Sequence, residues 1–366
     1  MNFSTLFVVF ACLFLFACRS DDDEVIPAPE YVDPFTGYLN EECDAYVTHR
    51  IGNDSYGKFH RFGEWWVIEG INELIVRRNL AGPDNDRFQQ FQFGVNAFLE
   101  EDDQLLVCTS RGMFSVTADG FIHQLDDRNC KDLQKIDGQL LSLTNHTANS
   151  GWNPSLNGIY AFSLSDTSYQ RLDAPIAELD DPWFFEFVQH EGHYFVKANY
   201  EIEVGVLEYD ADWNFLRLHQ PSTDPALGQD FQLFASSAQL FAWKDRLFLF
   251  ARNGSTHFLY EKVGNQFKTL RSWQLGNMRV GLDNVDWRLH TTLRERFIPR
   301  ADTLYCAGDG GLVKFYESDA DTLAYDLLVD PNLPTNIWAD LHFDDREQII
   351  VALVNHEFLV ERNCAE

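Results

Sequence analysis

From residue 40 onward, the chain repeats one pattern of apolar and polar positions. An apolar stretch runs into a short polar turn, a second apolar stretch follows, and a loop with glycine or asparagine leads to a third. A repeat of about 40 to 50 residues with four short strands is typical of β-propeller blades. We therefore predict an all-β protein in which residues 40–366 form a seven-bladed β-propeller. The first residues after the turn, 35 to 57 positions apart, are Trp65, Leu105, Leu140, Tyr194, Leu247, Leu304 and Ile349.

Two copies of this pattern resemble a known repeat family. Residues 95–116 and 333–360 each place an asparagine before an apolar strand, then an acidic turn, a second strand and a polar hairpin. They are similar to the propeller repeats in periplasmic sensor domains of two-component regulators. Both copies depart from that family where it usually has Trp-Ile-Gly-Thr, because they carry Leu106–Thr109 and Ile350–Leu353 instead. The resemblance implies the fold and leaves the function open.

The two ends of the repeat region predict how the propeller closes. The last copy supplies three strands, near residues 337–343, 348–353 and 357–361, whereas residues 45–50 form a spare strand near the start. We expect the spare strand to be the outer, fourth strand of the last blade. Antiparallel pairing would then place Cys364 beside Cys43, which predicts a disulfide in an exported protein.

The remaining cysteines of the propeller leave their pairing open. Cys108 and Cys130 are candidates to approach one another. Cys306 would then be left over as a small buried apolar residue.

The first 17 residues predict export. Residues 3–17 are almost all apolar, which is too short for a bilayer span of about 20 residues but suits a signal peptide. Leu15-Phe16-Ala17-Cys18 resembles the lipobox of bacterial lipoproteins, in which the cysteine becomes the first residue and carries the lipid. The usual Lys or Arg is missing before it. The resemblance implies a signal peptide at 1–17, a lipidated Cys18 and a linker at 18–39; a signal peptide cleaved near Ala17 without lipidation is the alternative.

The residues after Cys18 indicate where in the cell the protein is located. Arg19-Ser20-Asp21-Asp22-Asp23-Glu24 looks like the acidic export tag of surface lipoproteins in Bacteroidota. This resemblance implies an outer-membrane protein held by acyl chains such as palmitate, displayed at the cell surface or, alternatively, at the periplasmic face.

The charge of the chain excludes one class of partner. Lys and Arg number 28 against 57 Asp and Glu, so the formal net charge is −29. Such a chain repels phosphate backbones, and we expect no nucleic acid partner.

Long connections predict where a ligand would bind. Residues 144–158, 173–183, 219–234 and 272–287 fall on one face of the predicted propeller, whereas the hairpin turns of the other face are tight. Tryptophan, amide and imidazole groups suit a glycan and equally a partner protein. Packing between blades is the alternative for each Trp, and pairing with acids is the alternative for Arg288. The candidates on this face are Asn96, His146, Asn149, Trp152, Asn153, Trp183, Trp287, Arg288, Asn336 and Trp338.

Signatures of catalysis are missing from the sequence. It contains no Gly-x-Ser-x-Gly, His-Glu-x-x-His or Cys-x-x-Cys motif. Asp210–Asn214 is interpreted as a hairpin turn, since it lacks the glycine and glutamate of a calcium loop. We predict a non-catalytic binding protein without cofactor or metal. A hydrolase or lyase acting on a polysaccharide or lactone is the alternative, with Asp180, Asp181, Asp283 and Asp286 as candidate acids.

Overall fold

The computed structural model divides the chain into two units, Met1–Asp33 and Pro34–Glu366, and all described residues lie in the second. No helix occurs among them, so the described part of the chain holds no helix that could cross a membrane. The described residues are 46–50, 58–78, 83–90, 93–145, 157–176, 179, 182–200, 203–219, 238–253, 256–274, 297–300, 302–308, 311–317, 323–328, 341–343, 349–354 and 358–362.

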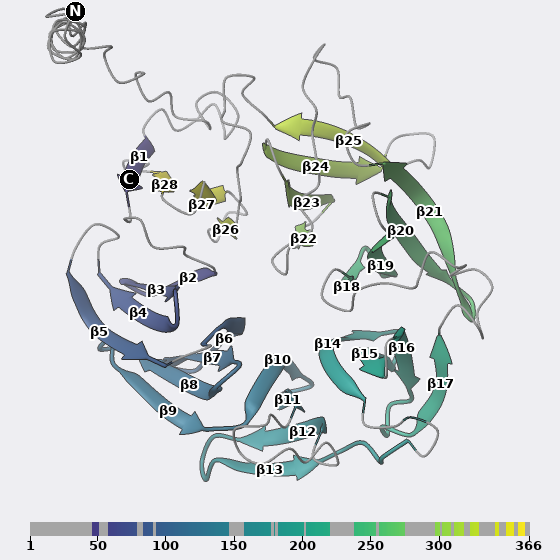
Figure 1. Ribbon diagram of the computed structural model, residues 1–366, viewed down its shortest axis with the longest axis horizontal. Helices are drawn as coiled ribbons and strands as arrows, with labels where there is room; N and C mark the ends of the chain where they lie inside the picture. Colours follow the sequence, from purple (N-terminus) through teal and green to yellow (C-terminus); the bar gives the residue numbers. More distant parts are fainter. Residues whose placement is uncertain are drawn as a thin grey trace, which may run out of the picture. The chain divides into compact units, whose positions relative to one another are not determined.

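The described strands form seven four-stranded antiparallel sheets, as predicted for the blades of a β-propeller (Figure 1). Consecutive strands are hydrogen-bonded neighbours in six of these sheets. The number of blades in the complete protein stays a prediction. The first three sheets are β2 (Phe59–Phe62), β3 (Trp65–Gly70), β4 (Glu73–Arg77) and β5 (Asp84–Gln89); β6 (Val95–Glu101), β7 (Gln104–Thr109), β8 (Gly112–Thr117) and β9 (Ile122–Asp126); and β10 (Asn129–Ile136), β11 (Gln139–Asn145), β12 (Gly158–Ser163) and β13 (Ser168–Arg171).

The later sheets follow the same order. They are β14 (Trp183–His190), β15 (His193–Tyr200), β16 (Glu203–Tyr209) and β17 (Phe215–His219); β18 (Gln239–Trp243), β19 (Arg246–Asn253), β20 (Thr256–Val263) and β21 (Gln266–Gln274); and β22 (Phe297–Arg300), β23 (Thr303–Gly308), β24 (Gly311–Glu317) and β25 (Leu323–Leu328). The last sheet contains β26 (Leu341–Phe343), β27 (Ile349–Val354) and β28 (Phe358–Arg362).

The seventh sheet joins both ends of the propeller. Its fourth strand is β1 (Tyr46–Arg50), which pairs antiparallel with β28 so that Tyr46 lies opposite Arg362. The prediction of a spare N-terminal strand completing the last blade is confirmed. This closure ties residues about 310 positions apart in one sheet, so neither end of the chain can leave without breaking a row of hydrogen bonds.

Burial explains the strand pattern within each blade. All six residues of β3 are buried, including Glu69, and β4 is buried except for Arg77. The second and third strands are covered on both faces by neighbouring blades, so they are almost continuously apolar. β5, the outer strand, alternates between partly buried and exposed residues, because only one of its faces is covered.

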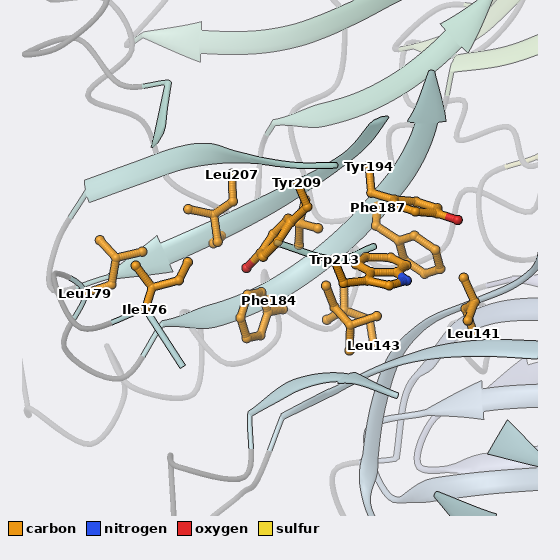
Figure 2. Close-up of a cluster of buried hydrophobic side chains, with 13 residues drawn as sticks. Leu141, Leu143, Ile176, Leu179, Phe184, Phe187, Tyr194, Leu207, Tyr209 and Trp213 are labelled. Carbon is orange, nitrogen blue, oxygen red and sulfur yellow. The ribbon is translucent and has the colours of Figure 1, made fainter. Parts of the chain in front are cut away.

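Adjacent blades meet through apolar side chains. Figure 2 shows such a cluster between the sheet of β11 and the sheet of β14–β16. Trp213 stacks on Tyr194 with ring centroids 3.8 Å apart and planes inclined by 11°. Leu143 and Phe187, from the two different sheets, are fully buried in the same cluster. The hydrophobic effect therefore acts mainly between blades, since a single sheet has no interior of its own.

The hairpin turns between first and second strands are tight, as the sequence predicts. Asp137 and Gly138 both have positive φ, at 51° and 79°, and Lys244 and Asp245 share this conformation at 50° and 56°. Two consecutive positive φ values define the turn whose twist matches a two-residue hairpin. The Asp210 turn is confirmed as well, because its carboxylate Oδ1 accepts hydrogen bonds from the backbone N–H groups of Asp212 and Asn214.

The strands that the long connections join meet them at the same end of the sheets. The connection 146–157 joins a second strand to a third, and 172–182, 220–238 and 275–296 each join a fourth strand to the next blade. In an antiparallel sheet these two kinds of connection leave from the same end. The strand order thus agrees with the predicted long-loop face.

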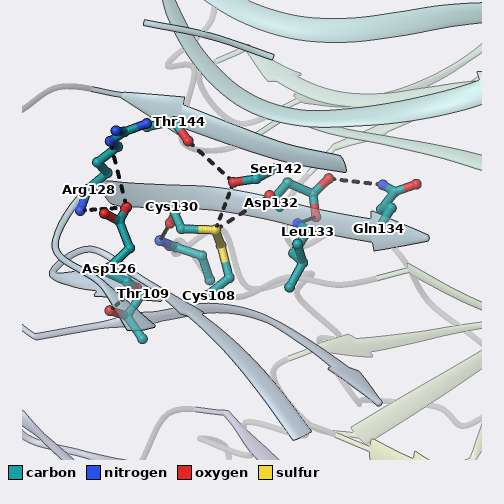
Figure 3. The surroundings of a disulfide bond; sticks show 12 residues. Cys108, Thr109, Asp126, Arg128, Cys130, Asp132, Leu133, Gln134, Ser142 and Thr144 are labelled. Carbon is teal, nitrogen blue, oxygen red and sulfur yellow. Dashed lines mark hydrogen bonds and ion pairs between the residues drawn. A yellow bond between two sulfur atoms is a disulfide. The ribbon is translucent and has the colours of Figure 1, made fainter. Parts of the chain in front are cut away.

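A disulfide links two neighbouring blades (Figure 3). Cys108 on β7 and Cys130 on β10 have Cα atoms 5.1 Å apart, and both side chains are buried. The approach of these two cysteines, left open by the sequence, is therefore a bond across a blade interface. Cys306 lies on β23 opposite Phe297.

We predict a second disulfide between Cys43 and Cys364, both of which lie outside the described residues. In sequence, Cys43 precedes Tyr46 by three residues and Cys364 follows Arg362 by two. Peptide mapping without reduction should recover these cysteines in one linked peptide. Cys43→Ser should then lower the free energy of unfolding by about 4 kcal/mol, because the closed loop is long. Recovery of Cys43 and Cys364 as free thiols in the unreduced protein would contradict the prediction.

Candidate functional site

The first strands of the blades carry the polar side chains that the fold brings together. We call β2, β6, β10, β14, β18, β22 and β26 the inner strands, since the first strand of a propeller blade borders the central channel. β10 packs against β6 and β14, β14 against β18, and β18 against β22. The five inner strands from β6 to β22 therefore lie next to one another in chain order.

A polar side chain at one fixed position holds successive inner strands together. The position lies four residues before the end of the strand, and its oxygen accepts a hydrogen bond from a backbone N–H of the next blade. The backbone N–H that donates this bond belongs in each case to the residue three positions before the end of the next inner strand. The pairs are Asp132 with Phe187 at 3.1 Å, Glu186 with Leu240 at 2.5 Å, and Gln239 with Phe297 at 2.6 Å.

A lysine secures the second of these bonds. Lys197 on β15 is buried and donates to Glu186 Oε1 at 3.0 Å and to the carbonyl oxygen of Ala238 in the next blade. Its ammonium also lies 5.5 Å from the ring centroid of Phe185. The Glu186 carboxylate thus has both a backbone donor and a cation, which offsets the cost of burying it.

The second strands add a similar contact. Asn145, the last residue of β11, accepts from the backbone N–H of Phe184 at 2.9 Å and donates to the Phe184 carbonyl oxygen at 2.6 Å. Asn157 donates to the Pro182 carbonyl oxygen at 3.0 Å. These amides fix the segment that enters β14.

A bulge recurs near the start of three consecutive inner strands. The extra residue is Asn96 in β6, Lys131 in β10 and Phe185 in β14, each five residues before the end of its strand. The Asn96 amide donates to the Cys130 carbonyl oxygen at 2.5 Å. A bulge re-aims one side chain without disturbing the rest of the ladder.

Asp132 has a strongly perturbed carboxyl group. Its oxygens accept from the side-chain amide of Gln134 (Figure 3). They also accept from the backbone N–H groups of Leu133 and Phe187. Burial, reinforced by the nearby charge of Glu186, nevertheless raises the pKa of Asp132 to about 6. The burial cost exceeds the gain from the three hydrogen bonds.

Two lysines lie near the start of the inner strands. Lys58 directly precedes β2, and its ammonium donates to the Asn96 carbonyl oxygen of the next blade. Burial lowers the pKa of Lys131, and the charge of Lys58 lowers it further. Glu69 accepts from the backbone N–H groups of Lys58 at 2.8 Å and Val95 at 3.1 Å, which fixes the starts of β2 and β6 relative to each other.

A His–Glu–His group lies elsewhere, on β15–β17, with Glu208 and His219 buried and His193 partly exposed. Glu208 accepts from His193 Nδ1 at 2.7 Å and His219 Nε2 at 2.8 Å. Burial opposes its ionisation, but these hydrogen bonds and Lys262 hold the pKa of Glu208 at about 2. Both oxygens are engaged within one blade, so the group ties three strands together. The described residues contain no cluster of three or more ligating side chains that could hold a metal ion.

Two of the predicted site residues are described. Asn96 and Trp183 both lie at the start of an inner strand, and their role in ligand binding stays a prediction. The Asn96 amide donates to the Cys130 carbonyl oxygen of the next blade, and Trp183 is half-buried opposite Asn199. The candidates outside the described residues are His146, Asn149, Trp152, Asn153, Trp287, Arg288, Asn336 and Trp338, together with Cys18 and the acids Asp180, Asp181, Asp283 and Asp286.

The polar residues of the inner strands were not predicted from the sequence. A signal existed, because counting backwards from the hairpin turns of four blades aligns Lys58, Asp132, Glu186 and Gln239 at one position. A polar residue inside an apolar strand is costly without a partner, so its recurrence at equal distance from the turn indicates a shared contact.

Comparison with known proteins supports the fold. No family model matches the chain, and no curated protein matches it either. The extracellular domain of the one-component system BT4673 from B. thetaiotaomicron is similar, with a TM-score of 0.52 and 13% identity over 89% of this chain. The chain covers 40% of that domain's length.

Two other solved structures are similar along nearly their whole length. YCF48 from Cyanidioschyzon merolae has a TM-score of 0.50 and 10% identity, covering 86% of this chain and 98% of its own. A chain of the mitotic checkpoint complex has a TM-score of 0.53 and 11% identity, covering 92% and 97%. At these identities the likeness is one of fold. The protein is an all-β propeller.

Asp132 should make the stability of the protein depend on pH. Its pKa is about 6 in the folded protein and 3.8 ordinarily, so the folded state binds the extra proton between these values. The free energy of unfolding should therefore rise by about 1 kcal/mol from this group as pH falls from 7 to 5. Urea unfolding at both pH values should show this gain in the wild type and lose it in Asp132→Asn. The exposed-turn variant Asp212→Asn should keep the wild-type gain; equal gains in all three proteins would contradict the assignment.

Proposed function

We propose that this protein is a lipid-anchored β-propeller of the outer membrane that binds a glycan or a partner protein through the face on which the inner strands begin. The observation that carries the proposal is the distribution of connections. All the long ones leave the strands at that end, where a rigid scaffold can present them to a ligand. The half-buried Trp183 at the start of β14 belongs to the same end.

The proposed location of the protein in the cell rests on its N-terminal residues. Leu15-Phe16-Ala17-Cys18 and the acidic residues after it support lipidation at Cys18 and display at the cell surface. The similar B. thetaiotaomicron structure is itself an extracellular domain, which is consistent with a place outside the cytoplasm.

The inner-strand carboxylates favour binding over catalysis. A general acid or base needs an oxygen free to meet the substrate. Asp132 instead accepts three hydrogen bonds from its own fold, and Glu186 is shared between Leu240 and Lys197. The raised pKa of Asp132 is the observation that favours the alternative, a hydrolase or lyase acting on a polysaccharide or lactone.

The anchor can be tested with radiolabelled palmitate in a bacterial host. The wild type and the control Cys12→Ala should incorporate the label, and Cys18→Ala should lose it, since only Cys18 follows a sufficiently long apolar segment. Incorporation that survives Cys18→Ala would rule out this anchor.

Ligand binding can be tested with a fragment beginning at Val25, applied to a glycan array and to extracts of the bacterial envelope. Trp152→Ala should weaken any hit at least tenfold, because an aromatic anchor dominates such a contact. Phe121→Ala is the matched control, as this side chain is 52% exposed in the turn between β8 and β9, at the opposite end of the strands. A hit lost in Phe121→Ala and kept in Trp152→Ala would place the ligand on the wrong face for the proposal.

A further inference from the structure

The hairpin His190-Glu191-Gly192-His193 carries two histidines that the proposed function does not use. His190 is the last residue of β14 and His193 the first of β15, and the two lie directly opposite each other in the antiparallel pair. Side chains at opposite positions share one face of the sheet, with Cβ atoms about 5 Å apart. Both rings also contact Phe195, each with its ring centroid 6.4 Å from that of the phenyl group. The strand register and these ring contacts place two imidazoles on one face at the tip of one hairpin.

A buried carboxylate orients one of the two rings. Glu208 on β16 lies opposite Phe195, on the same face of the sheet, and its Oε1 accepts from His193 Nδ1 at 2.7 Å. The other oxygen accepts from His219 Nε2, so the carboxylate is held on both sides. The Glu208 side chain is 2% exposed and that of His193 is 42% exposed. Since Nδ1 donates, His193 Nε2 carries a lone pair, and no group among the described residues bonds it.

Metal-binding histidines have the same arrangement. A ligating imidazole generally donates its second N–H to a carboxylate, which fixes the ring and makes the other nitrogen a stronger ligand. Glu208 has this role toward His193. Imidazole nitrogens bind zinc, copper and nickel well, whereas calcium and magnesium prefer oxygen ligands. The chemistry of this hairpin therefore favours a transition metal.

The charges around the hairpin act in both directions. The exposed carboxylate of Glu191 in the turn has Oε2 3.9 Å from His190 Nε2 and favours a cation beside the pair. The ammonium of Lys262 in the next blade lies 5.0 Å from the centroid of the Phe195 ring and opposes one. With two imidazole ligands and opposing charges, we expect a moderate affinity.

We propose that His190 and His193 bind a divalent transition-metal ion, Zn²⁺, Cu²⁺ or Ni²⁺, at the tip of the β14–β15 hairpin, with Glu208 as the positioning carboxylate. Two imidazoles are only part of a coordination shell, in agreement with the absence of a three-ligand cluster from the described residues. Water or a donor from another molecule fills the remaining positions. The hairpin lies at the opposite end of the strands from the long connections, so this site is separate from the face of the proposed function.

The test uses the full chain in detergent, treated with EDTA and dialysed, and calorimetric titration with Zn²⁺ and with Mg²⁺. The wild type should bind Zn²⁺ and not Mg²⁺. His193→Ala should weaken Zn²⁺ binding by about tenfold or more, because it removes one of two ligands. The matched control is His123→Ala, which changes an exposed histidine on β9 in another blade and should bind Zn²⁺ as the wild type does.

The positioning role of Glu208 has its own readout. Glu208→Gln should weaken Zn²⁺ binding by about tenfold, since the neutral amide no longer makes the His193 imidazole a stronger ligand. Electron paramagnetic resonance of bound Cu²⁺ should still show two nitrogen ligands in Glu208→Gln, as in the wild type, because both imidazoles remain. Loss of these nitrogen ligands would assign Glu208 a purely structural role and overturn its part of the proposal.

A second measurement keeps the metal site falsifiable if His193→Ala fails to fold. Diethyl pyrocarbonate modifies unprotonated imidazole nitrogens, and mass spectrometry of the wild type should show that Zn²⁺ slows the labelling of His193 and leaves the rate at His123 unchanged. The proposal is overturned if the wild type does not bind Zn²⁺, if His193→Ala binds it equally well, or if Zn²⁺ protects His123 as strongly as His193.

Discussion

The whole structure depends on satisfying the backbone of the inner strands. The first strand of a blade has one hydrogen-bonded neighbour within its own sheet, so half of its N–H and C=O groups need partners elsewhere. Here the partners are side chains of the preceding blade: Asp132, Glu186 and Gln239 each reach one backbone N–H of the next inner strand. Apolar packing between sheets supplies most of the stabilisation, but it is not directional, and these bonds fix how far one blade can slide against the next.

This constraint also explains which side chains near the start of β6 and β10 bond the next blade. Ala97 occupies the bonding position in β6 and cannot reach the next blade, so the bulge residue Asn96 bonds Cys130 in its place. In β10 the bonding position holds Asp132, which makes the usual contact and leaves the bulge residue Lys131 without a structural task. The Cys108–Cys130 disulfide holds the same segment covalently.

The fold could be predicted from the sequence because its strongest signals are local. Paired positive-φ residues such as Asp137-Gly138 mark the turns, and the apolar runs on either side mark the strands, so even β1 could be assigned to the last blade by counting strands. Contacts between blades were harder to predict. Whether Asn96 faces a ligand or the Cys130 carbonyl oxygen depends on a bulge of one residue, which no alternation of apolar and polar residues reveals. The approach of Cys108 to Cys130 depends on how two sheets stack against each other. Most of the predicted ligand residues lie in long connections, where sequence periodicity carries no positional information.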